Sequence, residues 1–216
     1  GSHRTRGTTV TTVSTMQGHA EPASLDRVDG FRQRLLDGLA ASIAEVGYRN
    51  TTVAHIVRRA RTSRRTFYQY FRDKEACFVG LLTDANADMI RQISQSVDPH
   101  APWQFQARQA VETWIKSMES EPALTLSWIR EVPALGDTAR ALQRETMDAF
   151  VAMIQTLCDT EEWRAARGGP VPRPLAIMLL GGLRELCATT VEDGGRISDV
   201  TEVAVQASIA LLSPPR

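Results

Sequence analysis

The 216-residue chain has few of the residues that carry disulfide, metal or cofactor chemistry. Its three cysteines, Cys77, Cys158 and Cys187, are far apart and odd in number, which fits a reducing cytoplasm better than a disulfide scaffold. The four histidines are dispersed, and the sequence has no HExxH motif, no CxxC motif and no glycine-rich phosphate loop. We therefore expect no metal, no cofactor and no enzymatic activity, with the cysteines serving as small core residues.

Long apolar runs are also missing. No run approaches the length of a membrane span, which predicts a soluble, cytoplasmic protein without a membrane partner. Nothing after Gly1-Ser2-His3, which looks like a tag remnant, has the layout of a secretory signal. Residues 1–24 hold too few apolar side chains to offset the entropy of ordering, so we expect a disordered N-terminal arm.

Lysine is nearly absent, and the positive charge that arginine supplies is unevenly distributed. The whole chain has 25 basic and 25 acidic residues, but residues 49–74 hold seven arginines and one lysine against a single acid, Asp73. This surplus of seven positive charges in 26 residues leaves the rest of the chain acidic by the same amount. A compact basic patch on an otherwise acidic protein indicates a polyanion partner at one end.

The spacing of apolar side chains predicts short helices around this basic run. From Leu25 to Val46 they recur every three or four residues, which predicts a helix that ends near Gly47. A helix of about two turns follows, and a two-residue break separates it from another short helix that Ser63 can cap. These proportions are typical of a helix-turn-helix. We therefore predict an all-α chain whose residues 25–72 form a three-helix, helix-turn-helix DNA-binding domain.

The orientation of the second short helix follows if its two phenylalanines are buried. Phe67 and Phe71 are four residues apart on one helix face, and with about 100° per residue Arg65 and Gln69 then point away from the core. Arginine can bind guanine and glutamine can bind adenine through bidentate contacts in the DNA major groove. Tyrosine hydroxyls and Lys74 can hold phosphates, which set register rather than sequence. This helix edge predicts double-stranded DNA as the partner.

The stretch from Thr51 to Val57, together with Ala60 to Ala76, resembles the DNA-binding signature of TetR-family transcriptional regulators. The resemblance covers roughly residues 25–82 and is most specific over residues 63–76. It implies a homodimer, usually a repressor, that a small molecule releases from its operator. By position it places base contacts on Arg64, Arg65, Thr66 and Tyr68, and phosphate contacts on Thr51, Thr52, Tyr70 and Lys74. The complete set of expected DNA-binding residues is Thr51, Thr52, Ser63, Arg64, Arg65, Thr66, Tyr68, Gln69, Tyr70 and Lys74.

The turn departs from the family's pattern at one position. The family usually has glycine after the alanine, and this chain has Arg61. If that position is left-handed, a residue other than glycine costs about 1–2 kcal/mol. Either the turn differs slightly, or the strain is tolerated for an extra cation near phosphate.

Residues 73–216 predict a larger helical domain for ligand binding and dimerisation, in which one long helix runs from about Asp137 to Ala165. Its aromatic and methionine stripe can line an apolar cavity or belong to an ordinary core. The candidate ligand-binding residues are Trp103, Trp114, Met118, Trp128, Met147 and Phe150. The candidates for a polar end of the pocket are Arg108, Glu112, Lys116, Arg130 and Glu131.

The last two helices are apolar nearly all round, so they need cover on both sides. A second copy supplies that cover most simply, through an isologous four-helix bundle, although a helix buried within a monomer is the alternative. The expected interface residues are Leu179, Gly181, Gly182, Leu183, Leu186, Val203 and Ile209. A two-fold dimer also suits a pseudo-palindromic operator.

Two further functions stay open at this point. The chain can be a ligand-responsive activator of the same family, because the sequence does not separate activation from repression. A helical protein that binds anionic membranes through the basic patch is less favoured, because the patch lacks the one-sided apolar face of interfacial helices.

Overall fold

The computed structural model describes residues 22–213, and their side chains from residue 30 onward. This part of the chain is helical and contains no strand. The expected disordered arm lies largely outside it, except that the first helix begins at Pro22, two residues before the predicted end of the arm. The helices are α1 (Pro22–Asn50), α2 (Val53–Arg59), α3 (Arg64–Tyr70), α4 (Lys74–Ser96), α5 (Trp103–Ser120), α6 (Pro122–Arg130), α7 (Asp137–Leu157), α8 (Glu161–Arg167), α9 (Arg173–Glu192) and α10 (Thr201–Leu212), with 3₁₀ turns η1 (Val132–Ala134) and η2 (Ile197–Val200).

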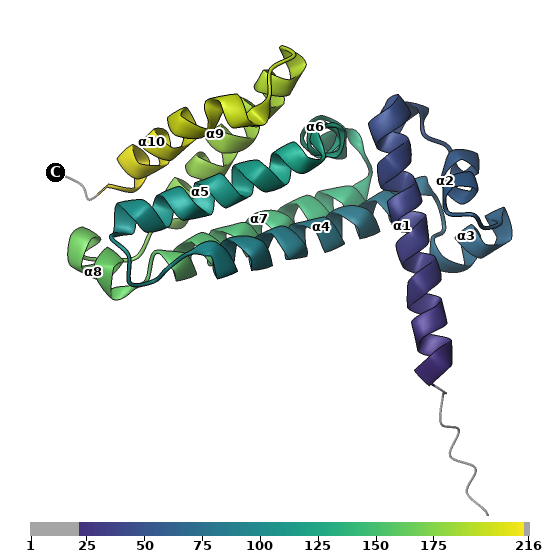
Figure 1. Cartoon of the computed structure of the whole chain (residues 1–216), viewed down its shortest axis with the longest axis horizontal. Coiled ribbons are helices and arrows are strands. Elements are labelled where there is room, and N and C mark those ends of the chain that lie inside the picture. The colour runs from purple at the N-terminus through teal and green to yellow at the C-terminus, as the bar shows by residue number, and fades with distance from the viewer. Residues whose placement is uncertain (1–21, 214–216) are drawn as a thin grey trace, which may run out of the picture.

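Helices α1, α2 and α3 form a small unit at one end of the molecule (Figure 1). The predicted stripe of α1 is buried at Leu35, Leu39 and Ile43, each at most 1 % exposed, whereas Val46 at its end is 36 % exposed. α2 lies so close to α1 that a Cβ on Gly38 would meet the carbonyl oxygen of Ile56 at 2.8 Å. A glycine is therefore required where these two helices touch.

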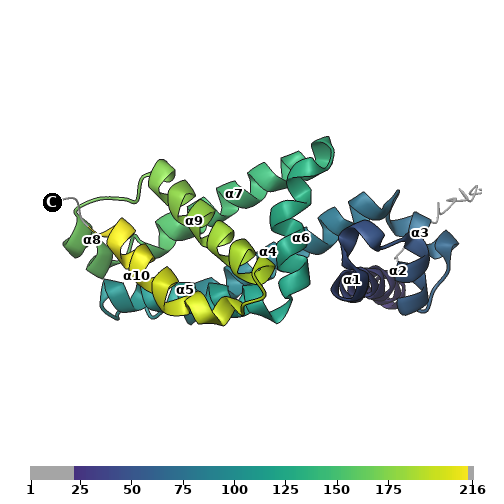
Figure 2. The same cartoon turned by 90° about the horizontal axis from the view of Figure 1, so that it is seen from above.

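Helix α4 leaves this unit and enters a bundle with α5 and α7, which α9 and α10 cover on one side (Figures 1 and 2). Asp73 caps its start, because the Asp73 carboxylate accepts a hydrogen bond from the N–H of Ala76 at 2.7 Å. One chain segment therefore connects the basic end of the molecule directly to the centre of the larger domain.

The long helix predicted from Asp137 to Ala165 is two helices. α7 ends at Leu157, and Thr160 begins α8 by accepting a hydrogen bond from the N–H of Trp163. Trp163 is buried against Trp103, with ring centroids 4.8 Å apart.

Helix α9 corrects the expectation that no segment is long and apolar enough to span a membrane. It meets that criterion by length and composition alone, and a third of its most apolar window is buried in the fold. Its inner face packs on α6 and α7. The apolar residues left outside on α9 belong to the surface described below.

Candidate nucleic-acid interface and effector cavity

The recognition edge of α3 is built on the two buried phenylalanines. Phe67 is fully buried and Phe71 is 8 % exposed, which confirms the predicted inward orientation. Ser63 begins the helix, since its hydroxyl oxygen accepts a hydrogen bond from the N–H of Thr66 at 3.0 Å. The Ser63 and Thr66 hydroxyls also lie 2.9 Å apart, so both are partly committed to holding the first turn.

The opposite edge of α3 faces solvent. Arg64, Arg65, Tyr68 and Gln69 are exposed, and Tyr70 is half-buried. Tyr68 is 57 % exposed although its ring packs edge-on against Phe67. Within residues 22–213, neither Arg64 nor Arg65 forms an ion pair or hydrogen bond with the protein. Their guanidinium donors are therefore available to bases or phosphates.

The seven arginines of the segment divide into two groups, and Lys74 is described separately below. Arg49, Arg59 and Arg72 pair with Glu131, Glu45 and Asp73, respectively. The other four arginines are Arg58, Arg61, Arg64 and Arg65. All four are exposed and unpaired in the described part of the chain. About half of the segment's positive charge is therefore free for a polyanion.

Lys74 has a structural task that the sequence did not indicate. Its ammonium donates hydrogen bonds to the carbonyl oxygens of Tyr48 and Thr51, each at 2.9 Å, and lies 4.2 Å from the centre of the Tyr48 ring. Burial lowers the pKa of Lys74, and Glu131 opposes that shift. At least two of its three N–H donors are thus committed to the junction of α1 and α2, which leaves at most one for a phosphate.

The expected phosphate contacts at the start of α2 need correction. Thr51 is 2 % exposed, its hydroxyl donates to the carbonyl oxygen of Gly47 at 2.8 Å, and its N–H is bonded to the end of α1. Thr52 is exposed but exchanges hydrogen bonds with His55 in a capping box at 3.3 Å. Thr51 therefore cannot reach a phosphate, whereas the Thr52 side chain stays at the surface.

The turn between α2 and α3 has the left-handed conformation that glycine favours. Arg61 has φ 49° and, in the described part, is the one residue other than glycine with positive φ. Its side chain is exposed. The strain considered from the sequence is therefore present, and it keeps a free cation next to the recognition helix.

An apolar cavity of about 70 Å³ lies in the larger domain. Its walls come from α4, α5, α7, α8, α9 and α10. Three buried polar groups at its wall are already satisfied or neutral: Gln106 and Ser208 donate to backbone carbonyls, and burial raises the pKa of Cys158 to about 12. The interior therefore offers apolar surface to a guest. Burial likewise raises the pKa of Cys77 and of Cys187 to about 12, so these thiols are inert core groups as predicted.

The predicted ligand residues separate in space. Trp114 and Phe150 line the cavity, and together with Trp128 and Met147 they line a smaller cavity of about 10 Å³ beside it. Trp103 instead packs on Trp163. The sixth candidate, Met118, is 1 % exposed and lies at a different groove, between α1, α4, α5 and α6.

The polar residues suggested for the end of the pocket lie elsewhere. Arg108 bonds to Glu112 and, through two contacts of 2.9 Å, to Glu202 on α10. Arg130 on α6 makes paired contacts with Glu185 and Glu192 on α9, and these bonds lower the pKa of both carboxyl groups. Glu131 accepts a hydrogen bond from Arg49, and Lys116 lines neither cavity. Arg108, Arg130 and Glu131 thus join helices across the surface of the bundle.

The sequence reasoning missed two polar features near the cavities. Asn86 on α4 donates to the hydroxyl of Thr146 on α7 at 3.3 Å, and both side chains are buried. Arg184 lines the smaller cavity, with its guanidinium 4.8 Å from the centre of the Trp128 ring. A single arginine after the apolar run of α9 was the available signal for this site.

The outer face of α9 and α10 is apolar and exposed. Met178 is 64 % exposed and Val203 is 61 % exposed, and Gly181 and Gly182 have no atom within 4 Å of a built Cβ. Of the predicted interface set, Gly181, Gly182 and Val203 lie on this face, and Leu186 and Ile209 are half-buried. Leu179 and Leu183 are corrections, because each is 8 % exposed and lines the cavity instead.

The sequence profile of the bacterial regulatory proteins of the tetR family matches residues 35–81, which include the recognition edge described above. Residues 35–81 therefore form a helix-turn-helix region of the tetR family. The chain is a helix-turn-helix transcriptional regulator in which a second, helical domain follows this region.

Curated relatives of this chain are helix-turn-helix transcriptional regulators. It is 35 % identical over 66 residues to the uncharacterized regulator YdgC of Bacillus subtilis. These residues make up 31 % of this chain and 33 % of YdgC. The chain is 24 % identical over 156 residues to the repressor AcnR of Corynebacterium diphtheriae, covering 64 % of this chain and 82 % of AcnR.

Solved structures share the fold at low identity. The fatty acid degradation regulator FadR of Bacillus halodurans matches with a TM-score of 0.73 at 18 % identity, over 84 % of this chain and 94 % of FadR. FadR of Bacillus subtilis, solved in complex with stearoyl-CoA, matches with a TM-score of 0.71 at 16 % identity, over 82 % and 97 % of the two chains. These likenesses show the common architecture.

Proposed function

We propose that this regulator is a homodimeric repressor of the TetR family. In the cytoplasm it binds a pseudo-palindromic operator through α3 and leaves it when a small apolar or amphipathic molecule enters the cavity. The observation that carries the proposal is the exposed edge of α3, where unpaired Arg64 and Arg65 stand beside Tyr68 and Gln69. We assign base contacts to these residues and to Thr66, with Thr52, Tyr70 and the remaining donor of Lys74 near phosphates.

In the proposed release step, a movement at the cavity is transmitted through α4 to the DNA-binding unit. Asn86 and Thr146 bind α4 to the wall of the smaller cavity, and only residues 71–73 separate α3 from α4. A molecule that enlarges the 70 Å³ cavity must move side chains on α5, α7 or α9, and such movement reaches α4. It shifts the operator equilibrium only if it binds the two conformations unequally.

Selection of bound duplexes from random pools, followed by a salt titration, tests the DNA-binding part. We expect a palindromic motif and an affinity whose logarithm falls linearly with the logarithm of salt concentration, because phosphate binding releases counterions. An absence of salt-dependent affinity for every duplex would contradict the proposal. A reporter that loses expression when the gene is deleted would instead indicate an activator.

The dimer is tested by Gly182→Leu. A side chain at this position meets nothing in the protomer, so the variant should fold with unchanged helix content. It should obstruct the α9–α10 face and reduce the mass in light scattering from two chains to one. Gly30→Leu is the matched control, because Gly30 is also a helical glycine with open space around its Cβ. An unchanged dimer mass for Gly182→Leu would exclude this face as the interface.

A further inference from the structure

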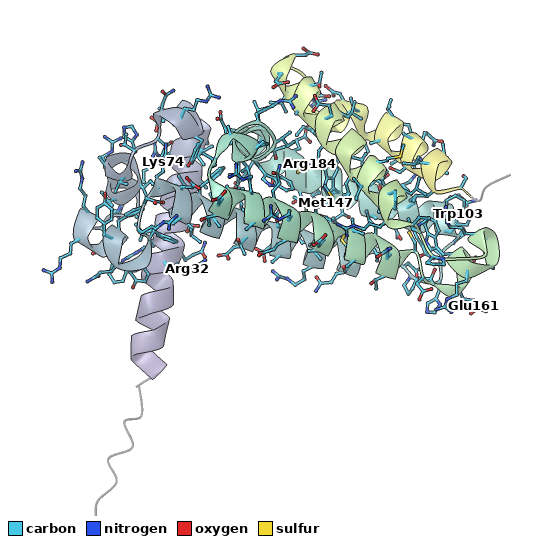
Figure 3. The ribbon with its side chains drawn as sticks, turned by 180° about the vertical axis from the view of Figure 1, so that it is seen from behind. Arg32, Lys74, Trp103, Met147, Glu161 and Arg184 are labelled. Carbon is cyan, nitrogen blue, oxygen red and sulfur yellow. The ribbon has the colours of Figure 1, made fainter. Side chains whose placement is uncertain are left out.

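Two buried nitrogens near the cavity have no hydrogen-bond partner: Nε1 of Trp128 and Nε of Arg184. Both residues line the smaller cavity, which shares the walls formed by Trp114, Phe150 and Leu180 with the larger one. Figure 3 places Arg184 and Met147 near the middle of the molecule, between Lys74 at one end and Trp103 at the other. The two unpartnered donors therefore lie beside the apolar space, on the side toward the DNA-binding unit.

No carboxylate forms a direct ion pair with Arg184 in the described part of the chain. The nearby acids of α9, Glu185 and Glu192, both accept hydrogen bonds from Arg130. Among the described residues Arg184 has no ion pair, and burial lowers its pKa while Glu185 opposes that shift. Arg184 is partly exposed, but its Nε is buried without a hydrogen-bond partner, and an anion that reaches the guanidinium forms strong, charge-assisted hydrogen bonds.

The side chain of Arg184 points away from the outer face of α9. Its guanidinium lies over the ring of Trp128 in the same protomer, 4.8 Å from the ring centre. The residues that α9 exposes for a second copy include Met178, Gly181 and Gly182. The guanidinium is thus turned inward to α6, where it contacts the wall of the cavity.

We propose that the effector is a carboxylate with an apolar body, whose carboxylate binds Arg184 and the indole N–H of Trp128 while its body fills the cavity between α5, α7 and α9. The inference rests on the proposed ligand-released repressor and deepens it by naming the chemical class. The planar fork of arginine suits a carboxylate in bidentate contact. The satisfied polar groups of the larger cavity suit an apolar body.

This position also connects the effector to the DNA-binding unit. Trp128 precedes Arg130, which binds α9, and Glu131, which accepts a hydrogen bond from Arg49 at the end of α1. A carboxylate held between α6 and α9 therefore acts on the helix that contacts α1. The effector reaches the operator-binding end through α6 as well as through α4.

The test compares octanoate, octanol and octylammonium, which share a chain and differ in the head group. Binding to the full-length protein is followed by calorimetry and by the fluorescence of the tryptophans at the site. We expect octanoate to bind roughly tenfold or more tighter than octanol, as a hydrogen bond to a charged group implies, and octylammonium to bind weakest. Octanoate should also weaken binding to the selected operator.

Arg184→Gln should remove the difference between octanoate and octanol and leave octanol binding unchanged. Arg144→Gln, an equal change of charge at an exposed site on α7, should keep the difference. The inference is wrong if neither octanoate nor octanol binds, if octanoate binds no better than octanol, or if Arg184→Gln preserves the preference.

Dimer mass and operator affinity, measured on the same samples, separate the remaining explanations. A loss of dimer in Arg184→Gln would assign the arginine to the interface and overturn the inference. A failure of the wild-type protein to bind any operator would overturn the proposed function. Intact operator binding without a carboxylate preference would overturn the further inference alone.

Discussion

The two ends of this molecule place their functional side chains in opposite ways. At the DNA-binding end, Phe67 and Phe71 are buried so that Arg64 and Arg65 face solvent. At the cavity end, Arg184 is turned inward among apolar walls. The first arrangement follows from residues a few positions apart in one helix, whereas the second needs helices distant in sequence to meet. This difference determines how much of each end can be predicted from the sequence alone.

The largest effect we expect comes from removing the base of the recognition edge. Phe67→Ala deletes a fully buried ring and should lower the free energy of unfolding by about 3–5 kcal/mol. Chemical denaturation measures the change, and operator binding should fall with it. Phe105→Ala is the matched control, because Phe105 is 53 % exposed and should change stability by less than about 0.5 kcal/mol. Equal stabilities of the two variants would show that α3 is not held by this core.

A smaller effect separates recognition from stability. Arg65→Ala removes an exposed, unpaired guanidinium and should leave unfolding unchanged, while it costs about 1–3 kcal/mol of discrimination at one base position. Competition between the selected operator and single-base variants measures this. Arg144→Ala on α7 should alter neither property. An operator preference that survives Arg65→Ala would show that the orientation of α3 on DNA is different.

The smallest effect concerns the turn. Arg61→Gly should relieve left-handed strain of about 1–2 kcal/mol, partly offset by the roughly 0.5–1 kcal/mol of extra backbone entropy that glycine loses on folding. The net result should be slightly raised stability, while salt-dependent affinity weakens for all sequences alike because one free cation is gone. Thermal unfolding and a salt titration test the two parts. Lower stability of the variant would mean that Arg61 makes a compensating contact.

The sequence predicted the DNA-binding end well because its determinants are local. Periodic apolar residues, the cap at Ser63 and the spacing of Phe67 and Phe71 each act within a few residues. Thr51 was misjudged although its partner Gly47 is only four residues away, whereas the error at Lys74 concerns partners that lie farther along the chain. Lys74 bonds back to Tyr48 across 26 positions, and no helical period indicates such a contact.

The cavity end was predicted only in part for the same reason. Trp114 and Phe150 line the cavity, but so do Leu179 and Leu183, which the sequence assigned to the dimer face. In a helix that is apolar nearly all round, composition alone does not show which side faces the partner. The two exposed glycines and Met178 mark the outer side once the neighbouring helices are in place.

The bonds of Lys74 bear on how this regulator could be recombined with others. Its ammonium joins the end of α1, the residue before the α2 cap and the start of α4. A chimera spliced at residue 73, where the sequence suggested the domain border, would inherit the lysine from one parent and its carbonyl acceptors from the other. Splicing beyond Phe78, whose ring stacks on Tyr48 at 4.2 Å, would transfer the whole joint intact. A chimera that exchanges the sensing domain should therefore have its junction inside α4, after Phe78.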